Sequence, residues 1–127
     1  MRKAGRLAAE ILDALAPMVQ PGVTTGELDD VVRQMTLDGG AVPATLGYRG
    51  YTHSCCISIN HVVCHGIPGD KQLKDGDIVN IDVTLILDGW HGDSSRMIPK
   101  RCRSSFVRTS RPARPASIVM KAMYSEC

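Results

Sequence analysis

The segment that most restricts the fold of this chain is Ile78–Leu87, in which apolar and polar residues alternate, followed directly by Asp88-Gly89. A period of two is typical of a β-strand with one buried face. An Asp-Gly pair after such a run predicts a two-residue hairpin turn, because both positions of that turn need positive φ. The sequence therefore predicts an antiparallel hairpin whose return strand runs over Trp90–Ile98.

This turn fixes which side chains share a face of the hairpin. Thr84 should face Asp93, and Asp82 should face Ser95. Asp82 and Asp93 then become diagonal neighbours with backbones ~7–8 Å apart. The opposite face carries four apolar residues and should belong to the core: Val79, Ile81, Val83 and Leu85.

Two converging carboxylates call for a physical explanation. Left alone they repel each other, and one is driven to take up a proton. A divalent cation removes that conflict, and carboxylates shared between metals ~3.5–4 Å apart are a standard part of two-metal hydrolase sites. Two alternatives remain open. Both Asp82 and Asp93 are solvated on an exposed face, or a bulge at Gly92 turns Asp93 to the other face. His91 falls on the carboxylate face too, where a surface role is the simpler interpretation.

Two amphipathic helices are expected before the hairpin. The first covers residues 3–17, with apolar residues at helical spacing: Leu7, Ile11, Leu15 and Val19. The second begins at a capping box formed by Thr24 and Glu27 and ends at Asp38-Gly39-Gly40. Its buried side should hold Leu28, Val31, Val32 and Met35.

Between the helices and the hairpin the helical period is lost. Residues 42–53 are expected to form a loop, and Cys55–Val63 a pair of strands interrupted near Asn60-His61. Helices followed by a mainly antiparallel sheet indicate the α+β class.

The charge distribution separates residues 1–99 from residues 100–127. The first part has 8 Lys and Arg against 12 Asp and Glu, and the second has 7 against 1. The second part also lacks a sustained period and contains Arg111-Pro112, so disorder is expected there. A nucleic-acid function would rest on this basic tail alone, and the tail lacks aromatic residues between its arginines.

The N-terminal residues imitate a signal peptide only superficially, because Glu10 and Asp13 interrupt the apolar run. No stretch is long enough to span a membrane. The five cysteines, an odd number with Cys55 and Cys56 adjacent, are expected to be free thiols in a reducing cytoplasm.

Several segments together resemble the bacterial-type (type I) methionine aminopeptidases. The segments that carry the resemblance are, in chain order, Arg2–Ala9, Pro21–Thr25, Leu46–Tyr51, Cys56–Asn60, Val62–Pro68, Ile78–Thr84 and His91–Met97. The resemblance extends from Met1 to about Met97. It implies the N-terminal half of the pita-bread (creatinase/aminopeptidase) fold. It also implies metal-dependent removal of the initiator methionine from nascent polypeptides in the cytoplasm.

The same resemblance implies roles for individual residues. Asp82 would chelate one of two divalent ions (Co, Mn, Fe or Zn), and Asp93 would bridge both. His65 would hydrogen-bond the substrate and help to stabilise the tetrahedral intermediate. The side chain of the substrate methionine would lie in a pocket lined by Tyr48, Tyr51 and Cys56. The implied partners are peptides with N-terminal methionine and nascent chains on the ribosome, with no specific nucleic acid and no membrane.

The sequence departs from the family after the return strand. The family's other metal ligands, one His and two Glu including the general base, come from its second half, and Glu126 matches no such motif. Where the family continues with a glycine turn and a long helix, Ile98–Cys102 differs. We therefore expect residues 1–99 to be a truncated catalytic domain and residues 100–127 a non-family tail, from a frameshift or a wrongly assigned gene end. Such a chain should bind metal weakly and have at most trace activity.

Two other functions are compatible with parts of the sequence. A small zinc-binding module could use the cluster Cys55, Cys56, His61, Cys64 and His65, although the cluster lacks a C-x-x-C pair. A non-catalytic binding protein on the pita-bread fold is the other alternative.

Overall fold

The sheet is built around β3, Ile78–Leu87, in the computed structural model, which describes residues 1–99. Strand β4, Trp90–Pro99, pairs with one edge of β3 along its whole length. The other edge pairs with β2, Cys56–Ile59, and with the two-residue strand β1, Val42–Pro43. All pairings are antiparallel. The predicted α+β architecture with an antiparallel sheet is confirmed.

The hairpin has the predicted turn and register. Asp88 and Gly89 have φ of 52° and 77°, as a two-residue turn of this kind requires. Thr84 pairs with Asp93, and Asp82 pairs with Ser95. The ladder is continuous through the glycine at position 92, so no bulge turns Asp93 to the inner face.

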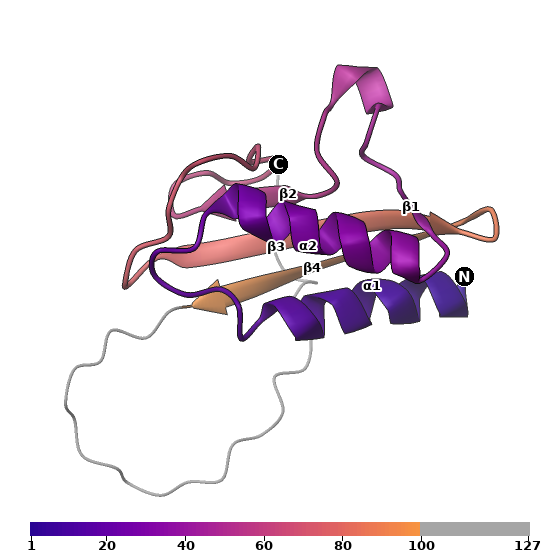
Figure 1. Ribbon diagram of the computed structural model, residues 1–127, viewed down its shortest axis with the longest axis horizontal. Helices are drawn as coiled ribbons and strands as arrows, with labels where there is room; N and C mark the ends of the chain where they lie inside the picture. Colours follow the sequence, from indigo (N-terminus) through magenta and orange to yellow (C-terminus); the bar gives the residue numbers. More distant parts are fainter. Residues whose placement is uncertain (100–127) are drawn as a thin grey trace, which may run out of the picture.

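The helices α1, Arg2–Leu15, and α2, Thr25–Asp38, lie side by side and cover one face of the sheet (Figure 1). The predicted capping box at the start of α2 is present: the Thr24 side chain accepts from the Glu27 amide, and the Glu27 carboxylate accepts from the Thr24 amide. Both helices turn their apolar stripes toward the inner face of the sheet. The four predicted core residues of β3 are fully buried there: Val79, Ile81, Val83 and Leu85.

Contact between α1 and the hairpin depends on Gly92. A Cβ atom at this position would lie 2.5 Å from the carbonyl carbon and oxygen of Ala4. Further along β4, the Arg96 guanidinium forms an ion pair of 2.6 Å with Asp13 and donates to the Leu12 carbonyl at 3.3 Å. The hairpin and the first helix are therefore joined at both ends of their contact.

Three local predictions were inexact. The first helix ends at Leu15 rather than at residue 17, and Val42–Pro43 forms a short strand in the predicted loop. The predicted strand pair over Cys55–Val63 is wrong in its second half. The strand ends at Ile59 because Asn60 adopts a positive φ of 55°, and Val63 is 91% exposed in the loop beyond it.

The tail predicted to be disordered and foreign to the family, residues 100–127, lies outside the described residues. Among residues 1–99, neither helix has the length and hydropathy needed to cross a membrane.

Candidate functional site

The outer face of the sheet, the face without helices, brings three predicted site residues into one area. Cys56 on β2 pairs with Asp82 on β3, and Asp82 pairs with Ser95 on β4. Side chains paired across a ladder project from the same face. Asp93 belongs to this face through its pairing with Thr84, whose hydroxyl donates to the Asp93 carboxylate at 3.1 Å.

The two carboxylates influence each other electrostatically. Partial burial raises the pKa of Asp82 above its usual value, and the negative charge of Asp93 raises it further. His65 acts in the opposite direction and lowers the pKa of Asp82. The groups that influence the pKa of Asp82 thus come from β4 and from a loop, while Asp82 itself belongs to β3.

The loop that carries His65 is fixed against the free edge of β2. The amide of Ile57 donates to the carbonyl of Gly66 at 2.8 Å, and the amide of Gly66 donates to the Ser58 hydroxyl at 3.1 Å. A side chain at Gly66 would collide with the carbonyl of Ile57, so only glycine permits this approach. The exposed His65 directly before it has a φ of 54°.

Tyr51 and Cys56 form a second part of the predicted site. The Tyr51 hydroxyl donates to the Cys55 carbonyl at 2.9 Å and lies 3.5 Å from the Cys56 sulfur. Burial raises the pKa of both the Tyr51 hydroxyl and the Cys56 thiol, so both groups are neutral near pH 7. A neutral phenol beside a neutral thiol is a soft, weakly polar surface suited to a thioether.

Tyr48 is separate from this pair. It belongs to the short helix η1, Tyr48–Gly50, which projects away from the sheet (Figure 1). Its side chain is 64% exposed, and the Arg49 guanidinium lies 5.5 Å from the ring centre. Among the hydrogen bonds within residues 1–99, none joins Tyr48 to Tyr51 or Cys56 through its side chain.

Asp29 on α2 was not recognised from the sequence. Its carboxylate is almost fully buried and accepts from the amides of Ser54 and Cys55 at 2.8 and 2.9 Å. The ring of His53 lies 3.3 Å from its second oxygen. One available signal was its position on the helix, since residue 29 shares a face with buried Val32.

The oxygen donors of the outer face fit a divalent cation in part. Hard carboxylate oxygens suit such ions, and the mutual repulsion of Asp82 and Asp93 would be relieved by one. Within residues 1–99, however, no group of three or more His, Cys, Asp and Glu side chains is placed so that it could hold a metal ion together. The part of the chain described here therefore offers two carboxylates rather than a complete site. The zinc-module alternative gains no support, because within residues 1–99 its Cys and His side chains form no group that could hold a metal ion. All three cysteines of residues 1–99 are free thiols, as predicted.

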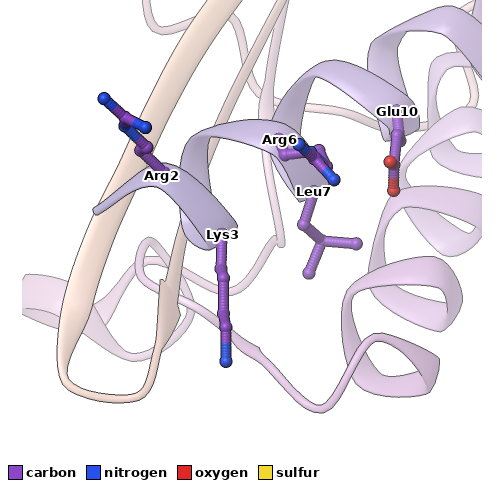
Figure 2. Close-up of a pocket in the computed structure, with 5 residues that line it drawn as sticks. All are labelled: Arg2, Lys3, Arg6, Leu7 and Glu10. Carbon is purple, nitrogen blue, oxygen red and sulfur yellow. The ribbon is translucent and has the colours of Figure 1, made fainter.

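A hollow in the described surface lies elsewhere. It has a volume of about 220 Å³ and lies along α1, where it is lined by Arg2, Lys3, Arg6, Leu7 and Glu10 (Figure 2). The four charged residues of this lining are exposed, and their side chains project from α1 on either side of Leu7 along the helix. It contains none of the predicted site residues, and its size reflects the spacing of surface side chains rather than a built pocket.

Comparison with known proteins gives a consistent assignment. The sequence model of metallopeptidase family M24 matches residues 1–113. The chain is 61% identical over 97 residues to a methionine aminopeptidase of Rickettsia prowazekii, and 64% identical over 99 residues to one of Escherichia coli K12. Each match covers 76% of this chain and 38% of the relative. The chain thus spans well under half the length of these relatives.

Solved structures show the same relationship in three dimensions. The crystal structure of methionine aminopeptidase from Rickettsia prowazekii superposes with a TM-score of 0.76 at 59% identity, over 77% of this chain and 40% of that one. The enzyme from Thermotoga maritima gives 0.74 at 32% identity, over 81% and 43%. The predicted N-terminal part of the pita-bread fold is confirmed. The family model extends beyond the 97–99 residues matched to the relatives, so the proposed boundary at residue 99 stays a prediction.

Proposed function

Because the chain belongs to metallopeptidase family M24, we propose that it supplies the metal-binding hairpin and the methionine pocket of a methionine aminopeptidase. The reaction is the metal-dependent removal of the initiator methionine from polypeptides. The observation that carries this proposal is the shared outer face of Asp82 and Asp93, on adjacent strands of a sheet whose other face is core.

Membership in a metallopeptidase family implies the use of a divalent metal. Asp82 would be a ligand of one ion, and Asp93 would bridge two. The metal, one of Co, Mn, Fe and Zn, would supply Lewis-acid polarisation of the peptide carbonyl and a water of lowered pKa. Thr84 would orient Asp93 for this role, because its hydroxyl donates a hydrogen bond to one oxygen of the carboxylate.

The substrate would lie between the loop of His65 and the pair Tyr51–Cys56. His65 is exposed and close to Asp82, so its ring can donate a hydrogen bond to a peptide held above the carboxylates. Tyr51 and Cys56 would contact the thioether side chain. Tyr48 would contact the substrate from η1, apart from Tyr51 and Cys56. Nascent chains on the ribosome, in the cytoplasm, are the proposed source of the peptides.

Residues 1–99 supply two carboxylates of the larger ligand set that the resemblance implies. Two carboxylates on an open sheet face hold a divalent ion weakly, since affinity grows with ligand number and enclosure. Alone, the chain should release methionine from a Met-Ala-Ser peptide at no more than a trace rate.

A chimera tests whether these residues serve the reaction. Residues 1–97 of this chain would replace the matching segment of the Rickettsia prowazekii methionine aminopeptidase. The chimera should release methionine in the presence of Mn²⁺ or Co²⁺. Asp82→Asn or Asp93→Asn should lower kcat/KM by at least ~100-fold, since even outer partners of a metal ligand contribute 10–100-fold.

The matched control for these variants is Asp88→Asn. This aspartate lies on the same hairpin but is exposed in the turn, where Asn tolerates positive φ. It should leave methionine release unchanged. A folded chimera with no activity, or full activity in Asp82→Asn, would contradict the proposed function.

A further inference from the structure

A buried carboxylate braces the segment that carries the methionine pocket. Asp29 lies in the middle of α2 and is only 6% exposed. One carboxylate oxygen accepts from two successive amides, those of Ser54 and Cys55. The other oxygen lies 3.3 Å from the His53 ring. A carboxylate so buried is tolerated only where such donors compensate for its lost hydration.

The braced segment connects directly to Tyr51 and Cys56. The Cys55 amide binds Asp29, while the Cys55 carbonyl accepts from the Tyr51 hydroxyl. Cys56 follows immediately and begins β2. The Tyr51 ring also meets the His53 ring edge to face, with centres 5.8 Å apart.

The segment has few other attachments that would fix its shape. The Ser54 hydroxyl is buried and finds no hydrogen-bond partner within residues 1–99. Thr45 donates to the His53 carbonyl at 3.0 Å, at the start of the segment. Asp29 is therefore the group that holds the backbone at residues 54 and 55, next to the pocket.

We infer that Asp29 is a positioning residue, which holds the backbone of residues 53–55 so that Tyr51 and Cys56 face the methionine side chain. The role in substrate binding rests on the proposed function, whereas the brace itself does not. The charge is compensated locally by amide donors, so an oxygen acceptor at this place should suffice. Asp29→Asn keeps that acceptor, and Asp29→Ala removes it.

Thiol reactivity in the full 127-residue chain provides a direct test. Cys64 is exposed, whereas Cys56 is only 9% exposed and lies beside the Tyr51 hydroxyl. Iodoacetamide labelling followed by peptide mass spectrometry should show rapid modification of Cys64 and slow modification of Cys56. Asp29→Ala should accelerate modification of Cys56 at least ~10-fold, the effect of local opening made easier by 1.4 kcal/mol. Asp29→Asn should leave the rate within about twofold of the original.

Asp30→Ala is the matched control, since it removes the same charge from the neighbouring, exposed position of α2. It should not change the labelling of Cys56. Hydrogen exchange of β3 and β4 should stay unchanged in Asp29→Ala, which separates a local brace from general destabilisation. Unchanged labelling in Asp29→Ala, faster labelling in Asp29→Asn, or global unfolding of Asp29→Ala would each overturn the inference.

In the chimera with the Rickettsia prowazekii protein, Asp29→Ala should raise KM for Met-Ala-Ser more than it lowers kcat, and Asp29→Asn should restore KM. A fall in kcat as large as the rise in KM would contradict a positioning role. The two proposals fail separately. An inactive chimera overturns the proposed function and leaves the labelling result intact, whereas unchanged labelling overturns only the brace.

Discussion

The two faces of the β3–β4 hairpin differ in almost every property although they alternate residue by residue. On the inner face, β3 places four fully buried apolar residues, Val79, Ile81, Val83 and Leu85, under α1 and α2. The outer face carries Asp82 and Asp93, which are half-buried and exposed. Because the side-chain period of a strand is two, one register determines both faces. The core that stabilises the inner face therefore also sets the distance between the two carboxylates.

The difference between the two faces is tested most directly by placing a carboxylate on the inner face. Leu85→Asp puts a charge into the core, where no partner compensates for its lost hydration, and should abolish cooperative unfolding. Ile78→Asp is the control on the outer face, since Ile78 is 49% exposed, and should change stability by less than about 0.5 kcal/mol. Circular dichroism during urea titration distinguishes the two. Comparable destabilisation by both variants would show that the faces do not differ as described.

The next largest effect on stability is expected at Gly92, where α1 packs against the inner face of β4. Gly92→Ala should destabilise the chain by about 2–3 kcal/mol, because the new Cβ meets the Ala4 carbonyl and forces the helix away. Gly69→Ala is the control, since a Cβ there meets nothing within 4 Å. Urea denaturation of both variants provides the comparison. A neutral Gly92→Ala would mean that the backbones of α1 and β4 are not in direct contact at this position.

The local parts of this architecture were predictable from the sequence, and the long-range parts were not. The hairpin register follows from the alternation and from Asp88-Gly89 alone, so it was predicted correctly. Val62-Val63 looks like a strand by composition. It forms a loop because Gly66 packs against the carbonyl of Ile57, a contact that no local pattern reveals. The role of Asp29 could not be predicted for the same reason, since its hydrogen-bond partners lie 25 and 26 residues further along the chain.

A smaller effect appears in the pH dependence of the outer face. Burial and the Asp93 charge raise the pKa of Asp82 in the folded state. Such a group favours folding at acidic pH, where it is protonated, and this contribution is lost as pH rises through its folded pKa. Asp82→Asn should therefore stabilise the chain at pH 7 and have no effect at pH values below the carboxyl range.

Thermal unfolding in the presence of a chelator, at several pH values, would measure this difference. The chelator matters because a bound cation would stabilise ionised Asp82 and reverse the sign. Asp75→Asn, a change of the same charge at an exposed turn, serves as the control. A destabilising Asp82→Asn at pH 7 without metal would show that the carboxylate does not experience the predicted repulsion.

The smallest expected effect concerns Arg96, a polar residue on the inner face of β4. Arg96 pairs across the ladder with Ile81 but reaches out to Asp13 and the Leu12 carbonyl at the end of α1. Arg96→Ala should cost about 0.5–1 kcal/mol, since the ion pair is exposed and only the bond to the carbonyl adds to it. Asp13→Ala should cost less, and its effect should shrink in 1 M salt, because high salt weakens exposed ion pairs. Equal, salt-insensitive losses would mean that Arg96 is part of the core. The division between a packed inner face and a polar outer face would then not extend to the end of β4.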